Sequence, residues 1–247
     1  MNFTIVRFDS IDSTNTQALK HARQGAGEGL CVVARQQNAG RGRQGRSWIS
    51  PNDAGLYLSV VLRPKIATRH LPLITFAAAV AVHENLAGIG LKPDIKWPND
   101  VLINEKKICG ILAEMAETNF GLAVVLGIGI NITSESFPPE MVDTATSISA
   151  ELKRPVTVSE VEESLLPGID QWYSRLQEPE GHSSIVDAWT ARSTYFRGKK
   201  VRATLNGGPI TGITDGLEPN GALRIKQANG RTINIQAGDV EQLRTED

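Results

Sequence analysis

The C-terminal part of the chain constrains the fold most, because its pattern differs from everything that precedes it. After Tyr195 the sequence becomes a series of short segments in which apolar and polar residues alternate: "KKVRATL", "PITGITDGL", "ALRIK" and "RTINIQAGDV". Pairs of Asn and Gly, which favour tight hairpin turns, lie between or beside these segments at 206–207, 220–221 and 229–230. Closely spaced strands of this kind predict a small β-barrel of residues 194–247, separate from a larger domain of residues 1–193.

The larger domain mixes strand and helix patterns. Apolar or alternating runs predict a hairpin around Glu105-Lys106 and strands over 3–8, 30–35, 55–62, 94–100 and 122–132. Helical patterns with start and stop residues cover 13–25, 72–88, 158–178 and 182–193. Residues 37–54 and 133–149 are polar, lack an apolar period and are predicted to be long loops.

Composition narrows the function classes. Lys and Arg number 26 against 27 Asp and Glu, which gives a formal net charge of −1, whereas a dedicated nucleic-acid binder usually carries a basic excess. Cys31 and Cys109 are too scattered for a disulfide framework. The N-terminus has no signal-peptide pattern, and no apolar stretch is expected to cross a membrane. We therefore expect a cytoplasmic protein with no membrane partner.

The segment "GRGRQGRSW" at 40–48 matches the dinucleotide-binding pattern G-x-G-x-x-G by its letters. That pattern needs a helix after the glycines and an acidic residue about 20 residues further on. Here Pro51 follows too soon for a long helix, and the later position holds Lys65. A nucleic-acid patch is the second interpretation, but three arginines and one tryptophan neutralise few phosphates, and the rest of the chain adds no basic stripe.

A second polar segment changes this balance. The string "KWPND" places Lys96, Asn99 and Asp100 around a bend, and Lys107 follows seven residues later. Two cations, an amide and a carboxylate on neighbouring segments, added to the three arginines, predict a polyphosphate site with room for Mg²⁺ beside Asp100. The phosphate-cradling string G-x-x-x-x-G-K-[ST] does not occur, so the nucleotide is not expected to bind in P-loop fashion.

Six strings in order carry a family resemblance that covers nearly the whole chain. The chain resembles the biotin protein ligases (biotin–[acetyl-CoA-carboxylase] ligases), of the short monofunctional type, and no DNA binding is expected because no N-terminal helix-turn-helix segment is seen. The strings are "DSTNT" at 12–16, "GRGRQGRSW" at 40–48, "GLYLSVVLRP" at 55–64, "KWPND" at 96–100, "KKICGILAE" at 106–114 and "GIGINI" at 127–132.

The resemblance implies a fold and a reaction. The fold is α+β: a mixed β-sheet with flanking helices, as in class II synthetases and biotin–lipoate ligases, followed by a small SH3-like β-barrel. The reaction uses ATP and Mg²⁺ to convert biotin into biotinyl-5′-AMP, and then transfers biotin to a lysine of the biotin carboxyl carrier protein of acetyl-CoA carboxylase. A lipoate–protein ligase of the same fold is the nearest alternative. Homodimers occur in the family, but no string here decides the oligomeric state.

The resemblance also implies residue roles. Lys107 and Arg41 are the implied catalytic residues; Lys106 is the competing assignment, which strand alternation directs to the other face. Cys109 is predicted to be a small buried filler. Asp100 is the implied metal residue, and Arg244 is a candidate barrel contact to the nucleotide. The implied biotin-binding residues are Ser13, Thr14, Asn15, Gln37, Gly40, Arg41, Gly42, Arg43, Lys107 and Gly110. The implied ATP- and adenylate-binding residues are Arg41, Arg43, Arg46, Trp48, Lys96, Asn99, Asp100, Lys107 and Asn131.

Overall fold

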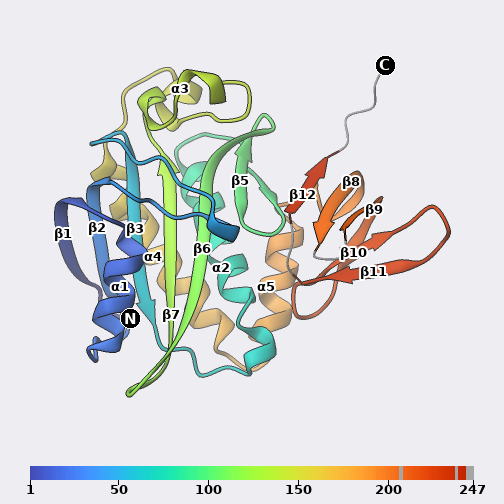
Figure 1. The fold of residues 1–247 in the computed structure, drawn as a ribbon, viewed down its shortest axis with the longest axis horizontal. Helices are drawn as coiled ribbons and strands as arrows, with labels where there is room; N and C mark the ends of the chain where they lie inside the picture. The colour runs from blue at the N-terminus through green and yellow to red at the C-terminus, as the bar shows by residue number, and fades with distance from the viewer. Residues whose placement is uncertain (206–207, 237–238, 243–247) are drawn as a thin grey trace.

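Two separate β-sheets organise the chain in the computed structural model, which describes residues 1–205, 208–236 and 239–242. The first sheet has seven strands in the order β1-β2-β3-β7-β6-β5-β4 (Figure 1). Its strands are β1 (Thr4–Ile11), β2 (Leu30–Gln37), β3 (Gly55–Leu62), β4 (Asp94–Lys96), β5 (Asp100–Ile103), β6 (Lys106–Thr118) and β7 (Gly121–Asn131). Only the β1–β2 pair is parallel, so the sheet is mixed, as the resemblance implies.

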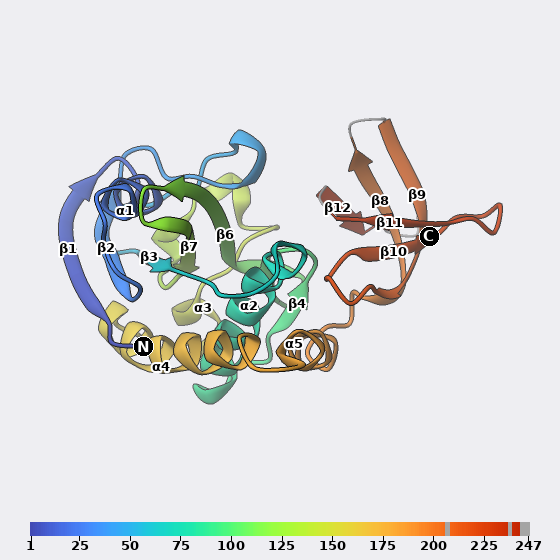
Figure 2. The ribbon, with the colours of Figure 1, turned by 90° about the horizontal axis from the view of Figure 1, so that it is seen from below.

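Five helices of the described residues flank this sheet. In Figure 2, α1 lies on one side of the sheet and α4 and α5 lie on the other. Helix α4 begins with a capping box, in which Thr157 and Glu160 each bind the other's backbone N–H. The helices are α1 (Thr14–Arg23), α2 (Leu73–Gly88), α3 (Ile148–Leu152), α4 (Val158–Leu176) and α5 (Gly181–Thr190).

Short helical segments occur within the two long loops. The loop expected over 133–149 contains 3₁₀ turns, and its last residues begin α3, a helix that the sequence analysis does not predict. The 3₁₀ turns of the structure are Arg43–Gly45, Thr68–His70, Ser134–Ser136 and Pro139–Met141. The polar composition of these loops hides such single turns, because turns this short show no apolar period.

The two faces of the large sheet differ in side-chain size. Successive residues of a strand point to opposite faces. On one face, which we call the packed face, β3 and β7 present Leu56, Leu58, Val60, Leu126, Ile128 and Ile130 to a core that also contains α2, α4 and α5. On the other, which we call the site face, the same strands present Ser59, Gly127 and Gly129, and α1 packs there against a much smaller apolar cluster.

Helix α2 is the most apolar segment of the packed face. The stretch Thr68–Gly88 is apolar and long enough to span a membrane by composition, yet 67% of its most apolar 18 residues are buried inside the fold. Ten of the residues of α2 are buried, including Leu73, Phe76 and Leu86. A core helix of a globular domain has this all-round apolar character, and α2 is such a helix.

The C-terminal sheet is antiparallel, with the order β11-β10-β9-β8-β12. The run "RTINIQAGDV", expected to be one strand, is two: β11 pairs with β10 and β12 pairs with β8, at opposite edges of the sheet. The predicted Asn206-Gly207 turn and Arg244 lie outside the described residues. The strands are β8 (Arg197–Leu205), β9 (Gly208–Leu217), β10 (Leu223–Lys226), β11 (Thr232–Ile235) and β12 (Asp239–Gln242).

Polar contacts join the C-terminal sheet to the first domain. The indole N–H of Trp97, within the string "KWPND", donates to the carbonyl of Gly221 at 3.0 Å. Thr194, in the connection between α5 and β8, donates from its backbone and its hydroxyl to Asp94. The C-terminal sheet therefore lies against the strands that carry "KWPND", beside the candidate site.

Candidate active site

A cavity of about 500 Å³ opens on the site face of the large sheet. Every predicted site residue among those described lines this cavity except Gly40 and Asn131. The lining comes from the start of α1, the end of β2, the loop after β2, the bend between β4 and β5, and the strands β6 and β7. Residues far apart in the sequence thus meet around one hollow.

The arginine-rich stretch forms a hairpin over this cavity. We call residues 40–48 the lid hairpin. The backbone N–H of Trp48 donates to Gly40 O at 2.9 Å, and that of Gly42 donates to Arg46 O at 2.7 Å, so the two arms pair with each other. A single 3₁₀ turn, Arg43–Gly45, forms the tip. The stretch therefore opens no long helix, as its sequence context predicts.

The structure explains the glycine at position 40 by the close approach of the two arms of the lid hairpin. A Cβ atom built on Gly40 would lie 2.2 Å from the carbonyl oxygen of Trp48. No side chain fits there, because the opposite arm of the lid hairpin passes too close. The predicted contact of Gly40 with biotin stays a prediction, and its observed role is to let the arms approach.

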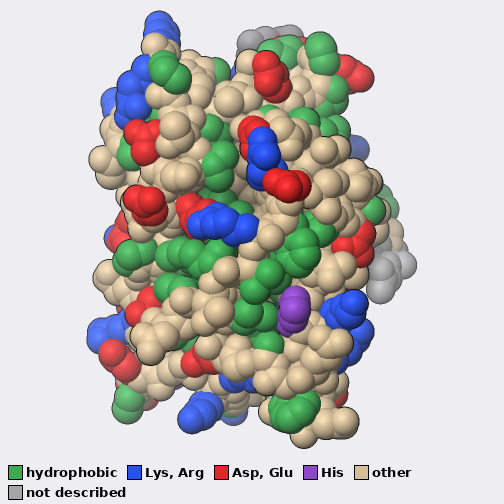
Figure 3. All heavy atoms as spheres, turned by 90° about the vertical axis from the view of Figure 1, so that its left-hand side faces the viewer, with side chains coloured by type: hydrophobic (Ala, Val, Ile, Leu, Met, Phe, Trp, Pro, Cys, Tyr) green, Lys and Arg blue, Asp and Glu red, His purple; other side chains and the backbone are tan. Residues whose placement is uncertain are grey.

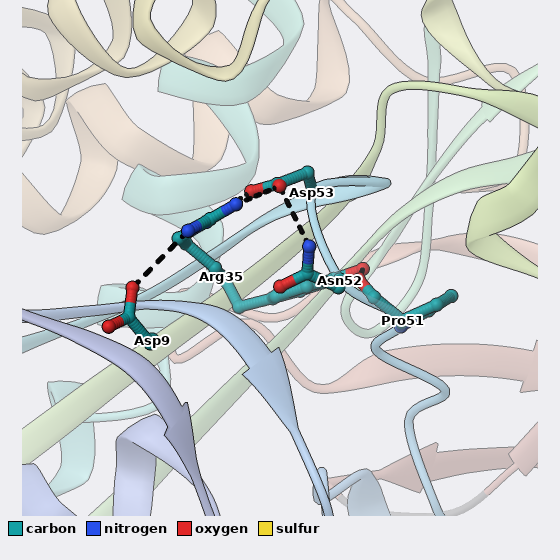
Figure 4. A network of polar contacts seen from close by, with 6 residues as sticks. Asp9, Arg35, Pro51, Asn52 and Asp53 are labelled. Atoms are coloured by element: carbon teal, nitrogen blue, oxygen red, sulfur yellow. Dashed lines mark hydrogen bonds and ion pairs between the residues drawn. The ribbon is translucent and has the colours of Figure 1, made fainter.

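Side-chain contacts bind residues 50–53, which follow the lid hairpin, to the large sheet. Figure 4 shows Arg35, on β2, between Asp9 of β1 and Asp53 at the end of the loop. The Arg35 Nε donates to Asp53 Oδ1 at 2.7 Å, and Asn52 donates to the other oxygen at 2.8 Å. Gln37 donates to the Ser50 hydroxyl at 2.7 Å. These contacts attach residues 50–53 to β2 and leave the arginine-bearing hairpin beyond the attachment.

One end of the cavity is a network of uncharged polar groups. Gln37 Oε1 accepts from the backbone N–H of Thr14 at 2.7 Å and lies 3.1 Å from its hydroxyl. The Ser59 hydroxyl, fully buried, lies 2.7 Å from Thr14 Oγ1 and 2.6 Å from Asn15 Oδ1. Hydroxyls and amides held in fixed positions can donate to and accept from a neutral polar ligand.

The floor of the cavity is formed by glycines. A Cβ atom on Gly127 would lie 2.1 Å from Asn15 Oδ1, and one on Gly129 would lie 2.5 Å from the Trp48 ring. Gly110, which pairs with Gly129 across β6 and β7, also faces the Trp48 ring. The glycines thus allow α1 and Trp48 to approach the sheet. Glycine in a strand permits such a close approach, because it carries no side chain.

The other end of the cavity is cationic. Lys107 Nζ lies 2.6 Å from Asp100 Oδ1 and 5.3 Å from the centroid of the Trp48 ring. Lys106 points elsewhere and donates to the carbonyl of Val142 at 2.8 Å, so Lys107 is the one of these two neighbours that lines the cavity. Lys96 lines the same end, with its Nζ 6.0 Å from the Tyr195 ring.

The tip of the lid hairpin reaches the "KWPND" bend. Arg43 Nη1 donates to Asn99 Oδ1 at 3.2 Å, and Asn99 Nδ2 in turn donates to Ile111 O on β6 at 2.7 Å. The two strings that the sequence analysis singles out separately are therefore joined by a hydrogen bond. Arg46 lines the same cavity.

A second hollow, of about 320 Å³, adjoins the first. Lys107, Trp48, Lys96 and Asp100 line both hollows, so these side chains lie between them. Asn131 lines only the second hollow, where its Nδ2 donates to Thr146 O at 3.0 Å. Its predicted place beside a nucleotide stays a prediction, but it is near Lys107 in space.

Glu114 is a residue of the site that the sequence analysis missed. It lies on β6 and accepts from Asn15 Nδ2 at 2.8 Å and from Arg41 Nη2 at 2.7 Å. The signal was alternation along β6: Gly110 lies on the site face, so Glu114, four residues further on, lies there too. Ser59 was missed for a similar reason, since only strand pairing shows that it shares a face with Gly127 and Gly129.

Cys109 faces the core. The predicted buried filler is confirmed, since the side chain is fully buried and burial raises the pKa of its thiol. Strand alternation would put it on the face of Lys107, but the β5–β6 pairing shifts register there, from Leu102 opposite Lys107 to Val101 opposite Cys109. The extra residue turns Cys109 toward the packed face, away from the cavity.

The described residues contain no group of three or more side chains arranged to hold a metal ion. Asp100 is a carboxylate at the cationic end of the cavity. Mg²⁺ is often held by one or two carboxylates together with the phosphates of its nucleotide. Asp100 fits that arrangement, in which the nucleotide brings most of the oxygen ligands.

Positive and negative side chains are mixed on one face of the molecule (Figure 3). On the face that Figure 3 shows, blue and red side chains lie next to one another and form no basic stripe. The salt bridges of Arg7 with Glu162 and of Arg35 with Asp9 and Asp53 are examples of such pairing. This arrangement differs from the basic stripes by which proteins follow a nucleic-acid backbone.

Comparison with known proteins agrees with the resemblance. Residues 7–131 match the Biotin/lipoate A/B protein ligase family, and residues 196–242 match the Biotin protein ligase C terminal domain. The bifunctional ligase/repressor of Bacillus spizizenii is 38% identical over 94% of this chain and 72% of its own length. The biotin–[acetyl-CoA-carboxylase] ligase of Paracoccus denitrificans is 36% identical over 93% of this chain and 96% of its own.

A solved structure is also similar. The biotin protein ligase of Aquifex aeolicus in complex with biotin and ATP matches with a TM-score of 0.84 and 29% identity, covering 98% of this chain and 99% of that one. The match extends over both sheets of the fold.

Proposed function

The chain belongs to the biotin protein ligases of the biotin/lipoate A/B protein ligase family, and from that premise we propose how its cavity works. The protein is an enzyme that joins biotin to a protein at the expense of ATP. A carboxylate oxygen of biotin attacks the α-phosphorus of ATP, and the bond to the β-phosphate breaks, which releases pyrophosphate. A carrier lysine then attacks the acyl carbon of biotinyl-5′-AMP, and AMP leaves.

One observation supports the assignment of each end of the cavity to a part of the substrates. A single cavity has an uncharged polar end and a cationic end, with Lys107 at the latter. The uncharged end, built from Thr14, Asn15 and Gln37, suits the neutral urea ring of biotin, and the cationic end suits a carboxylate beside phosphates. Biotin bound this way points its carboxylate toward Lys107.

Lys107 is the proposed centre of the first step. Two anions repel each other as they react, so a fixed cation between them lowers the barrier. The position of Lys107 between the two hollows supports this role, because its ammonium can contact the carboxylate and the α-phosphate together. Arg41 and Arg43 supply further charge, and a planar guanidinium binds carboxylate or phosphate through two hydrogen bonds.

The nucleotide is proposed to occupy the hollow beside Lys107. Trp48 and Asn131 line that hollow and offer a ring face and an amide to the adenylate. Mg²⁺ would reach the site on the phosphates of ATP, with Asp100 as its protein carboxylate and Lys96 and Asn99 at the phosphate end. When bound, the ion would offset phosphate charge. The remaining proposed contacts are Ser13, Gly42, Gly110 and Arg46.

The partner of the second step is proposed to be the biotin carboxyl carrier domain of acetyl-CoA carboxylase. The name of the Paracoccus relative, 36% identical to this chain, supports that choice. Residues 1–193 are the proposed catalytic domain, and residues 194–247 are the proposed barrel. Helix α5 ends at Thr190 and β8 begins at Arg197, which supports a boundary between these two elements. A cytoplasmic location and a homodimer remain proposals.

A labelling assay tests the function. The protein is incubated with ATP, Mg²⁺, biotin and a purified carrier domain, and the carrier is probed with streptavidin. We expect labelling that depends on every component, while lipoate in place of biotin gives no transfer. Absence of labelling, under conditions where a known biotin ligase labels the same carrier, would overturn the assignment.

A further inference from the structure

Glu114 joins two sides of the cavity, the start of α1 and the lid hairpin. Its side chain is 21% exposed, and each carboxylate oxygen has a partner from a different part of the chain. One oxygen accepts from Asn15, at the start of α1, and the other accepts from Arg41, on the lid hairpin. These partners are 99 and 73 residues away in sequence. Glu114 is thus a junction between helix, strand and lid.

Asn15 is held firmly at this junction. Its Oδ1 lies 2.6 Å from the Ser59 hydroxyl, and its Nδ2 donates to Glu114. The glycine at 127 leaves space for it, because any Cβ there would overlap Oδ1. The amide orientation is therefore fixed from both ends, and Glu114 fixes the donor end.

Glu114 orients Arg41 but leaves most of its N–H donors available to a ligand. A guanidinium carries five N–H donors, and the bond to Glu114 uses the Nη2 end. A carboxylate beside an anion site weakens anion binding by electrostatic repulsion. Glu114 offsets this effect by orienting Arg41, because an arginine that is held in place before the ligand arrives loses less conformational entropy when it binds.

Two arginines of the lid hairpin bind groups of the strands and the bend beneath it. Arg43 at the tip meets Asn99, and Arg41 on the first arm meets Glu114. The second contact is an ion pair whose arginine is 45% exposed, so solvent weakens it but does not remove it. Removing the carboxylate charge should release the first arm.

We propose that Glu114 is a positioning residue that holds the lid hairpin closed over the biotin end of the cavity, through Arg41 and Asn15. It touches neither reacting atom. The proposal rests on the proposed function only for its effect on biotinyl-5′-AMP, because the contact of Glu114 with Arg41 joins two residues of this chain. Loss of the contact should speed opening of the lid and escape of the activated intermediate.

The first test needs no ligand. Trypsin cleaves after arginine, and the lid hairpin offers Arg41, Arg43 and Arg46. In the full chain, Glu114→Gln should raise the rate of cleavage within residues 41–46 about 10-fold, since cleavage follows the open population. Glu117→Gln is the matched control, an exposed glutamate three residues further along β6, and should leave the rate unchanged. Equal cleavage of both variants would overturn the proposal.

The second test uses the reaction. After a single turnover without carrier, Glu114→Gln should release biotinyl-5′-AMP about 10-fold faster than the natural protein and raise the KM for biotin, with a smaller change in kcat. Arg41→Gln should release it at least as fast, because this variant also removes the guanidinium, and adding Glu114→Gln to Arg41→Gln should cause no further increase. Additive effects, or lost stability on thermal unfolding with unchanged release, would contradict action through Arg41. If the natural protein forms no biotinyl-5′-AMP, the proposed function fails, and the trypsin result still decides the lid contact.

Discussion

The packed face and the site face of the large sheet come from the same strands but use opposite kinds of residue. Along β7, Leu126, Ile128 and Ile130 fill the core with α2 and its neighbours, while Gly127 and Gly129 leave space on the other side. The space is filled by polar side chains of α1 and by the lid hairpin. A strand can therefore provide stability through one set of alternate residues and a binding site through the other.

The difference between the two faces predicts which substitutions lower stability and which slow the reaction. Apolar burial provides most of the folding free energy, so truncations on the packed face should lower stability. The site face contributes little apolar area, so changes there should alter the reaction more than the fold. The predictions below test this separation, beginning with the largest effect.

Lys107→Ala should reduce the rate of biotinyl-5′-AMP formation by about 100- to 1,000-fold, because one fixed charge at the reacting groups is lost. Biotin binding should be partly kept, since the uncharged end is intact. Pyrophosphate release measures the rate, and calorimetry measures biotin binding. Lys106→Ala is the matched control on the neighbouring residue and should stay close to the natural rate. Near-normal turnover of Lys107→Ala would show that the lysine is wrongly assigned.

Arg43→Gly should loosen the hold on the intermediate about 10-fold, because it removes the arginine at the lid tip and its bond to Asn99. We expect free biotinyl-5′-AMP in solution and labelling of unrelated proteins present in the assay. The control for lost charge is Arg231→Gly, which changes an exposed arginine in the turn between β10 and β11. Retention equal to that of the control would refute a holding role for Arg43.

His83 tests the packed face by pH, with the smallest expected effect. Burial, with Arg192 nearby, lowers the pKa of His83 from its usual 6.5. The unfolded chain therefore takes up a proton first as the pH falls below about 6.5, and the free energy of unfolding decreases there. His83→Gln should weaken this dependence in urea titrations at pH 7.5 and 5.5. An unchanged dependence would mean that other groups cause it; His21→Gln on α1 controls for the loss of an imidazole.

The sequence was most informative where a function depends on neighbouring residues. Local patterns single out the string at 40–48, the start of α1, and Lys107 in place of Lys106. The structure places residues of that string, Lys107 and the start of α1 around one cavity. The mixed sheet and the small C-terminal sheet follow from strand patterns and the resemblance.

The missing parts depend on contacts across the chain. Glu114 and Ser59 show their roles only when strand pairing puts them beside Asn15. Cys109 faces the core because of a local shift in β5–β6 pairing that alternation alone does not reveal. The division of the last predicted strand into β11 and β12 depends on two partners, β10 and β8, that lie at different edges.

Two neighbouring residues of β7 test the central claim most directly. Gly127→Val places a side chain where Asn15 lies, and Ile128→Ala removes one from the core. Biotinyl-5′-AMP formation and the free energy of unfolding are measured for both variants. We predict that Gly127→Val slows the reaction about 100-fold and costs only about 1 kcal/mol of stability, while Ile128→Ala costs about 3 kcal/mol of stability and keeps the reaction. The reverse result, or equal losses of both quantities in both variants, would contradict the separation of the two faces.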